Sequence, residues 1–128
     1  MSDPTTEFFD TLGRRRHERL LEAAAGTIRF DLADGRETEH WFLEISHGDL
    51  SVSRDARGAD LVVRADHGFF NKIVTGEANM LAAWLRNQVI FEGSLQLSRS
   101  FELILPGPPG ARHPRRDRRD RENAAGQR

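Results

Sequence analysis

The spacing of apolar residues constrains the fold of this 128-residue chain more than any other feature. Before Gly26 apolar residues recur mostly three or four positions apart, whereas beyond it they alternate with polar ones. The first spacing is typical of an amphipathic helix, and the second is typical of a strand with one buried face. Asp3 and Pro4 match an N-cap and a first-turn proline, so a helix is predicted from there through Ala25, with Gly26 after its end. Gly13 has a low helix propensity and marks a position for a bend or break.

Beyond Gly26 the pattern predicts four strands in succession. They cover residues 28–32, 41–45, 50–53 and 61–63. The dipeptide Asp34-Gly35 and the tripeptide His47-Gly48-Asp49 are turn sequences that separate the first three of them. These three strands are therefore expected to form an antiparallel meander, with the fourth strand following a loop.

The second half of the chain returns to helical spacing and then to alternation. Asp66 is the expected N-cap of a helix over residues 67–74, which ends at Thr75-Gly76, and a second helix covers residues 80–85. Alternation over residues 89–97 predicts a fifth strand, in which Gly93 indicates a bulge or a close approach. Residues 99–105 are expected to form a short terminal helix.

This order of elements predicts the α+β class. The expected architecture is a five-stranded mixed, mainly antiparallel sheet with helices packed on one face. The helices cover one face only, because strands with a clean apolar/polar alternation bury a single side. The residues expected on the outer face are Arg29, Asp31, His40, Glu44, Ser51 and Ser53.

The apolar residues stop at Leu105, where a stretch rich in proline and glycine begins. We therefore expect one globular domain over residues 1–106 and a disordered Arg-rich tail over residues 107–128. The tail carries seven arginines and three acidic residues. This composition is compatible with two alternatives, a solvated tail and a tail in weak contact with an anionic membrane. Nucleic acid is not an expected partner, because the tail has no aromatic residue for base stacking and the whole chain has a net charge of −1.

Several classes of chemistry are excluded or disfavoured by composition. The absence of cysteine removes disulfides, thiolate nucleophiles and iron–sulfur clusters. The five histidines have no metal-binding spacing, and no nucleophile elbow or phosphate-binding glycine loop occurs. We therefore expect a protein that is not an enzyme and has no cofactor or metal. No apolar run is long enough to cross a bilayer, and a cytoplasmic protein is expected. The eighteen arginines against one lysine suggest a bacterial genome of high GC content.

Large apolar side chains gather in the two short helices and on the strands expected to face them. The candidate ligand-binding residues are Phe30, Trp41, Leu43, Phe69, Phe70, Ile73, Met80, Leu81, Trp84, Leu85, Phe91 and Phe101. Aromatic residues fill packed cores in most proteins, and they also line apolar ligand pockets. Composition therefore leaves open whether these side chains fill a core or line a cavity.

Short motifs at the junctions of the elements resemble the sterol carrier protein 2 (sterol-binding domain) family over about residues 8–105. The matching segments are Gly26-Thr27-Ile28-Arg29-Phe30-Asp31-Leu32 with Asp34-Gly35, Ala59-Asp60-Leu61-Val62-Val63 leading into Asp66, Phe69-Phe70 with Thr75-Gly76, the helix from Met80 to Leu85, and Phe91-Glu92-Gly93. Each motif is short, but their full order is uncommon.

The resemblance implies a lipid-binding or lipid-transfer protein without catalytic activity. Its ligand would be a fatty acid, a fatty acyl-CoA, a phospholipid or a sterol-like molecule, held in an apolar tunnel between the sheet and the helices. The resemblance also leaves an alternative, because the same fold resembles auxiliary domains attached to bacterial enzymes. In that case the chain is an accessory or interaction module, and the cavity is a packed core or a dimer contact.

Overall fold

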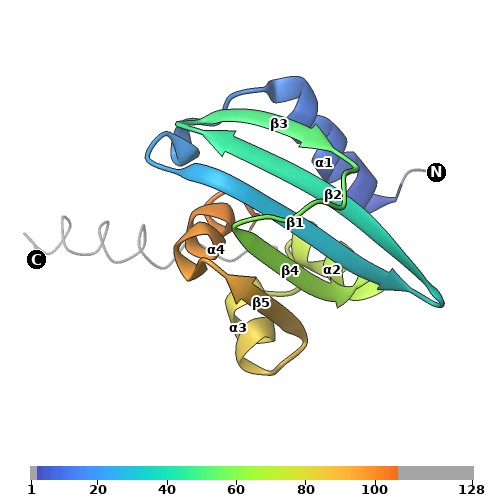
Figure 1. Ribbon diagram of the computed structural model, residues 1–128. Helices are drawn as coiled ribbons and strands as arrows, with labels where there is room; N and C mark the ends of the chain where they lie inside the picture. The colour runs from blue at the N-terminus through green and yellow to red at the C-terminus, as the bar shows by residue number, and fades with distance from the viewer. Residues whose placement is uncertain (1–2, 107–128) are drawn as a thin grey trace, which may run out of the picture.

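A five-stranded sheet organises residues 3–106, which are the residues that the computed structural model describes (Figure 1). Its strands are β1 (Ala25–Asp34), β2 (Glu37–Ser46), β3 (Asp49–Ser53), β4 (Leu61–Asp66) and β5 (Val89–Gly93). Their order across the sheet is β3-β2-β1-β4-β5; β1 and β4 are parallel, and the other neighbouring pairs are antiparallel. This confirms the predicted mixed, mainly antiparallel sheet. The expected Arg-rich tail lies outside the described residues.

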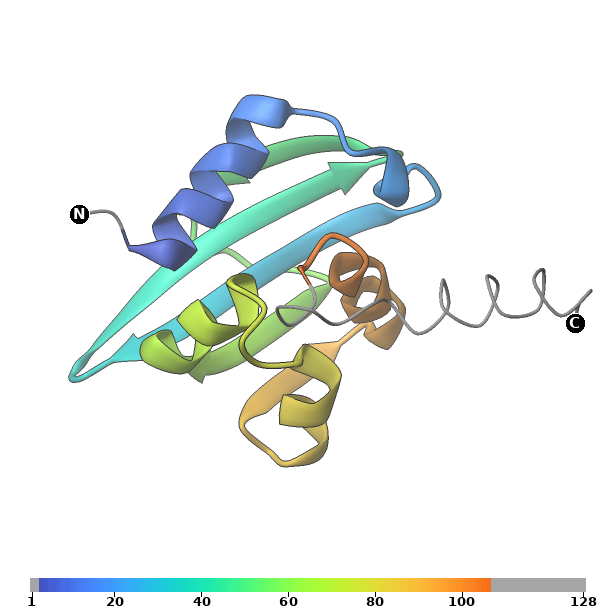
Figure 2. The ribbon, with the colours of Figure 1, turned by 180° about the vertical axis from the view of Figure 1, so that it is seen from behind.

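The helices lie on one side of this sheet, as Figure 2 shows. They are α1 (Pro4–Arg15), the short 3-10 helix η1 (Arg19–Leu21), α2 (His67–Val74), α3 (Met80–Leu85) and α4 (Leu95–Glu102). In the two views α1 crosses β2 and β3, whereas α2 and α4 cover β1 and β4. Helix α3 lies against β5 at the edge of the sheet. The predicted α+β class is confirmed.

Local hydrogen bonds explain why the helices begin where they do. The Asp3 side chain accepts a hydrogen bond from the Thr6 amide, and Asp66 accepts one from the Phe69 amide. Asn79 caps α3 in the same way through the Ala82 amide. Each of these side chains satisfies one of the amides that the first turn of a helix leaves without a partner. The predicted starts at Pro4 and His67 are therefore confirmed.

The first helix is shorter than predicted. It ends at Arg15, because Arg16 adopts a left-handed backbone conformation (φ 63°) and its carbonyl accepts a hydrogen bond from the Leu50 amide of β3. The predicted continuation to Ala25 is wrong, and so is the break at Gly13, which lies inside the helix. Gly26 belongs to β1, where the side chain of Leu97 occupies the space that a Cβ would need.

The last strand is also shorter than predicted. It ends at Gly93, and α4 begins at Leu95, so the expectation of a strand through Leu97 is wrong. Ser94 caps α4 by accepting a hydrogen bond from the Leu97 amide, and its own amide donates to the Asp60 carbonyl. The terminal helix therefore starts four residues earlier than expected, and the chain after it continues in turns.

The core lies between the sheet and the helices and is rich in aromatic rings. Phe9 of α1 stacks on Trp41 of β2 with ring centroids 4.8 Å apart, and it also contacts Phe30 of β1 at 4.9 Å. Phe30 in turn contacts Phe101 at 5.0 Å and Phe70 at 5.6 Å. Four of these rings are completely buried, and Trp41 is nearly so. The packing of helices on the sheet is therefore built around Phe9 and Phe30.

The opposite face of the sheet carries a network of charged side chains. Asp31 accepts a hydrogen bond from Arg29 at 2.9 Å and lies 2.8 Å from the His40 ring. All three residues lie on the face where they were predicted. Phe42 also points to this side, yet it is buried because the Arg57 guanidinium lies over its ring. No helix within residues 3–106 has the length and hydropathy needed to span a membrane.

Candidate functional site

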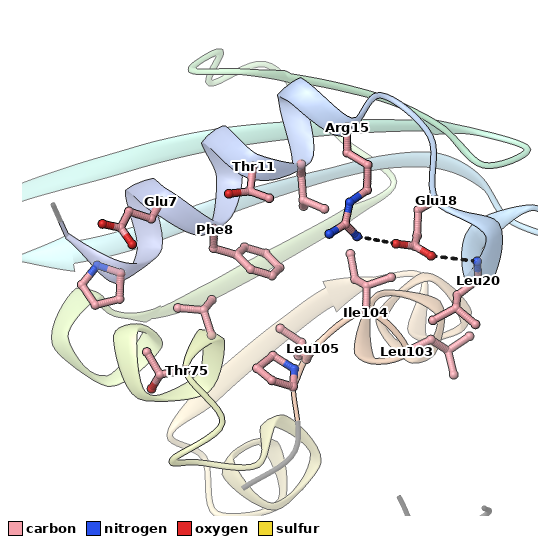
Figure 3. Close-up of a pocket in the computed structure, with 14 residues that line it drawn as sticks. Glu7, Phe8, Thr11, Arg15, Glu18, Leu20, Thr75, Leu103, Ile104 and Leu105 are labelled. Carbon is pink, nitrogen blue, oxygen red and sulfur yellow. Dashed lines mark hydrogen bonds and ion pairs between the residues drawn. The ribbon is translucent and has the colours of Figure 1, made fainter. Parts of the chain in front are cut away.

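A groove of about 530 Å³ lies between α1, η1, α2 and the segment that follows α4 (Figure 3). This volume is within the range of small-molecule pockets in proteins. The residues that line it are Pro4, Glu7, Phe8, Thr11, Leu12, Arg15, Glu18, Leu20, Val74, Thr75, Leu103, Ile104, Leu105 and Pro106. Seven of them have large apolar side chains, so the groove offers an apolar surface on the helical side of the molecule.

The groove has both polar and apolar lining, and its apolar part consists of residues at the outer edge of the core. Phe8 and Leu12 are four residues apart on α1 and therefore face the same way. The Phe8 ring meets Phe9 edge-on at 5.3 Å and Phe101 at 5.9 Å, so the wall of the groove continues into the core. On the opposite side, the chain after α4 turns through Ile104, whose amide donates to the Phe101 carbonyl. Figure 3 shows Phe8 extending from α1 toward this segment.

An ion pair lies at one end of the groove. The Arg15 guanidinium is 2.7 Å from the Glu18 carboxylate, and that carboxylate also accepts a hydrogen bond from the Leu20 amide. Both residues reach the groove because α1 ends at Arg15 and η1 begins directly after Glu18. The groove therefore combines an apolar trough with a charged end, an arrangement that suits an elongated amphipathic molecule.

The other end of the groove begins at Pro4, beside a histidine that connects three elements. His67, the first residue of α2, places Nε2 2.9 Å from the Asp3 carboxylate and Nδ1 2.9 Å from the Glu39 carboxylate of β2. Burial lowers the pKa of His67, but the hydrogen bond to Asp3 and the nearby carboxylates outweigh it, so the pKa is raised. The pKa of Asp3 is lowered, because hydrogen bonds from His67 and the Thr6 amide outweigh its burial.

A pH dependence of stability follows from these contacts. A raised pKa means that the folded state binds the His67 proton more tightly than the unfolded chain does. Its contribution is complete below about pH 6.5 and is lost as the pH rises through the pKa of the folded state. Urea unfolding between pH 5.5 and 8.5 should therefore show a falling free energy of unfolding, and His67→Gln should remove this part of the slope. An unchanged slope in His67→Gln would contradict the assignment.

The twelve candidate residues from the sequence lie in three environments. Phe30, Trp41, Leu43, Phe70, Ile73, Met80 and Phe101 are buried in the core. Phe69, Trp84 and Phe91 are partly buried, and the rings of Trp84 and Phe91 stack with centroids 5.6 Å apart. Leu81 and Leu85 are exposed on α3. The core brings the first group together, and none of the twelve is among the residues that line the groove itself.

The lining residues of the groove were not predicted, although the sequence carries a signal for them. Leu103, Ile104 and Leu105 are three consecutive apolar residues, which cannot all face the core from one helix. Phe8 and Phe9 are adjacent, so one of them must point away from the buried face of α1. Apolar residues in excess of what a helix face can bury are thus the signal that points to this surface.

A second depression of about 550 Å³ lies at the junction of β1, β4 and α4. Its lining residues are Ala23, Ala24, Ala25, Asp60, Ser94, Gln96, Leu97 and Ser100. Leu97 is its one large apolar side chain, and Asp60 already accepts hydrogen bonds from the amide and hydroxyl of Thr27. The groove beside α1 is therefore the stronger candidate for an apolar ligand.

The fold and the groove define a small α+β domain in which helices cover one face of a mixed sheet and leave an apolar trough between them. The sequence model of the SCP-2 sterol transfer family matches residues 9–106. The chain belongs to this family, and the resemblance drawn from the sequence motifs is confirmed.

Comparison with curated proteins finds relatives that are much longer than this chain. Hydroxysteroid dehydrogenase-like protein 2 of Xenopus tropicalis is 28% identical over 106 residues, which cover 81% of this chain and 25% of the relative. The chain thus spans about a quarter of the length of the curated relatives it matches.

Solved structures show the same fold. Sterol carrier protein 2 from Yarrowia lipolytica, in its apo form, superposes with a TM-score of 0.65 at 20% identity, covering 81% of this chain and 92% of that one. Sterol carrier protein-2 from Aedes aegypti, in complex with the C16 fatty acid palmitate, gives a TM-score of 0.59 at 18% identity and covers 81% and 96% of the two chains. The arrangement of sheet and helices is therefore that of sterol carrier proteins.

Proposed function

We propose that this domain binds and transfers a lipid with a long apolar chain, and that the groove beside α1 receives it. The observation that carries the proposal is the apolar surface from Phe8 to Leu105, which is continuous with the aromatic core. Membership of the SCP-2 sterol transfer family supports it, as does the palmitate held by the similar Aedes aegypti protein.

The binding energy in this proposal comes from apolar burial. Each methylene moved out of water contributes about 0.8 kcal/mol, so a long acyl chain needs no specific polar contact to bind. The charged end at Arg15 and Glu18 lies where a polar headgroup would remain in water. Fatty acids, fatty acyl-CoA, phospholipids and sterol-like molecules all satisfy these requirements. The proposed role is that of a carrier without a catalytic step.

The buried candidate residues enter the proposal as the deeper part of the site. Phe8 contacts Phe9 and Phe101, and these rings contact Phe30 and Trp41. A tunnel between sheet and helices would therefore open if these rings moved apart to admit the end of an acyl chain. In that case the groove is the mouth of the tunnel, and the aromatic residues line its inner end.

An accessory role is the second candidate function. The chain matches a quarter of the length of relatives named as dehydrogenase-like proteins, so this fold occurs as a part of larger proteins. Native mass spectrometry of protein purified from a bacterial host distinguishes the two. Co-purified lipid supports a carrier, whereas an empty protein in a stable complex with a partner supports an accessory module.

Binding of palmitate tests the groove directly. The double variant Phe8→Ser/Leu20→Ser removes apolar surface from two sides of the groove, and we expect its Kd for palmitate to rise at least about tenfold. Leu95→Ser is the matched control, because Leu95 is similarly exposed but does not line the groove. Isothermal titration calorimetry gives the Kd values. Equal affinities of all three proteins would contradict the location of the site.

A further inference from the structure

Exposed apolar side chains concentrate at one corner of the molecule that the groove does not include. Of the five large apolar residues that are exposed within residues 3–106, four lie between positions 81 and 95. Leu81 and Leu85 of α3 are 46% and 69% exposed, and Ile90 of β5 is 50% exposed. These three residues are called the α3–β5 patch below. It lies at the edge of the sheet opposite β3 (Figure 1).

Buried residues and a hydrogen-bonded turn fix the two elements that carry the patch. Met80, Ala83 and Val89 are buried beneath it. The turn between α3 and β5 is closed by a hydrogen bond from the Gln88 amide to the Ala83 carbonyl, with Asn87 in a left-handed conformation (φ 63°). Leu81 and Leu85 are four residues apart and share one face of α3. Their exposure is therefore a feature of the folded structure and not of a frayed end.

The segment that carries the patch is poor in charged residues for this chain. Residues 78–91 contain no Asp or Glu, and Arg86 is their single charged residue, although 30% of the whole chain is charged. The next carboxylate along the chain, Glu92, is paired with Arg64 at 2.6 Å. A cation among apolar side chains is complementary to a surface that presents phosphates above hydrocarbon.

Trp84 adds a side chain suited to the same kind of surface. It lies between Leu81 and Leu85 in sequence, is partly buried, and stacks on Phe91. An indole has an apolar body and a polar N–H, and tryptophan is enriched at the boundary between membrane and water for this reason. The patch therefore combines exposed leucines, an isoleucine, an arginine and a tryptophan on two adjacent elements.

We propose that the α3–β5 patch docks on the surface of a bilayer that contains anionic lipid. In this arrangement Leu81, Leu85 and Ile90 enter the boundary between headgroups and acyl chains, and Arg86 contacts phosphates. A second copy of the chain fits less well, because a stable dimer buries about 800 Å² on each partner and three exposed side chains cover far less. The proposal adds a surface for docking to a membrane to the proposed lipid site.

Co-sedimentation of the full chain with vesicles of phosphatidylcholine and phosphatidylglycerol tests the proposal. A salt concentration of about 0.3 M suppresses long-range attraction of arginines elsewhere in the chain. We expect the protein to sediment with the vesicles. Vesicles with brominated acyl chains should also quench tryptophan fluorescence, since Trp84 would lie at the contact while Trp41 is buried in the core. Failure of the protein to bind these vesicles would overturn the proposal.

Three variants locate the contact. Leu81→Ser/Leu85→Ser should weaken vesicle binding at least about tenfold, because together the two side chains expose more than one full leucine. Arg86→Gln should weaken it about fivefold on anionic vesicles and leave binding to pure phosphatidylcholine unchanged. Leu20→Ser is the matched control, since Leu20 is 55% exposed but lies on η1, and it should bind vesicles as the parent does.

The outcomes against the proposal are distinct. Vesicle binding by Leu81→Ser/Leu85→Ser at the parent level would overturn it, and loss of binding in Leu20→Ser alone would move the contact to η1. A dimer that is seen in sedimentation velocity and is abolished by Leu81→Ser/Leu85→Ser would replace the bilayer by a second copy. Palmitate affinity measured in parallel separates this proposal from the proposed function, because the patch variants leave the groove intact.

Discussion

Phe30→Ala is expected to lower the free energy of unfolding by about 3–5 kcal/mol. Phe30 has no exposed surface, and its ring contacts Phe9, Phe70 and Phe101. Its removal leaves a cavity among side chains that come from the sheet and three helices and cannot all move inward. In a domain of about a hundred residues this corresponds to a fall in Tm of roughly 15 °C or more. Urea unfolding and a thermal melt measure both quantities.

Phe8→Ala is the control that gives this measurement a functional meaning. Phe8 is only partly buried and lines the groove, so its truncation should cost about 1 kcal/mol while weakening palmitate binding. If Phe30 instead faced an open tunnel, Phe30→Ala would lose little stability and would change palmitate affinity more than Phe8→Ala does. The pair of variants therefore separates residues that hold the fold together from residues that contact the ligand.

The features that were predictable from sequence are those set by neighbouring residues. The alternation of Ile28, Phe30 and Leu32 with polar residues reports which side of β1 is buried, because strand geometry alone decides it. Asp3 and Asp66 are recognisable as caps for the same reason, since each bonds an amide three residues away. Such local rules were sufficient for the fold class, for both ends of α2 and α3, and for the starts of α1, β4 and β5.

The errors occurred where a distant segment decides the local structure. The helix ends at Arg15, because the carbonyl of Arg16 accepts a hydrogen bond from the Leu50 amide, which is 34 residues away in the chain. No residue near Arg16 in the sequence indicates this contact. Ser94 to Leu97 fits either a strand or a helix, and the contact of Ser94 with Asp60 selects the helix. The groove was missed for a related reason. Its lining includes the outer sides of residues that also pack on the core, such as Phe8 and Ile104, and only the packing of distant segments brings them together.

Gly93→Ala is expected to lower the free energy of unfolding about as much as the loss of a core aromatic ring does. The cause is the backbone, because Gly93 has no side chain to lose. Gly93 has φ 117°, a conformation that residues with a side chain rarely adopt. A Cβ at this position would overlap the carbonyl oxygen of Asp60, and that oxygen accepts the hydrogen bond from the Ser94 amide. Alanine would therefore force apart the end of β5 and the start of β4, where Gly93 pairs with Leu61. We expect a loss of about 3 kcal/mol or more in the free energy of unfolding.

Two other glycines separate the causes of this loss. Gly35 also has a positive φ (66°) but has open space around its Cα, so Gly35→Ala should show the conformational strain alone, about 1–2 kcal/mol. Gly58 has neither a positive φ nor a close neighbour, and Gly58→Ala should leave stability unchanged within about 0.5 kcal/mol. If Gly93→Ala lost no more stability than Gly35→Ala, the strands would be able to shift and absorb the extra atom. In that case the close approach of Gly93 to the Asp60 carbonyl would not determine how β5, and with it the α3–β5 patch, is held on the sheet.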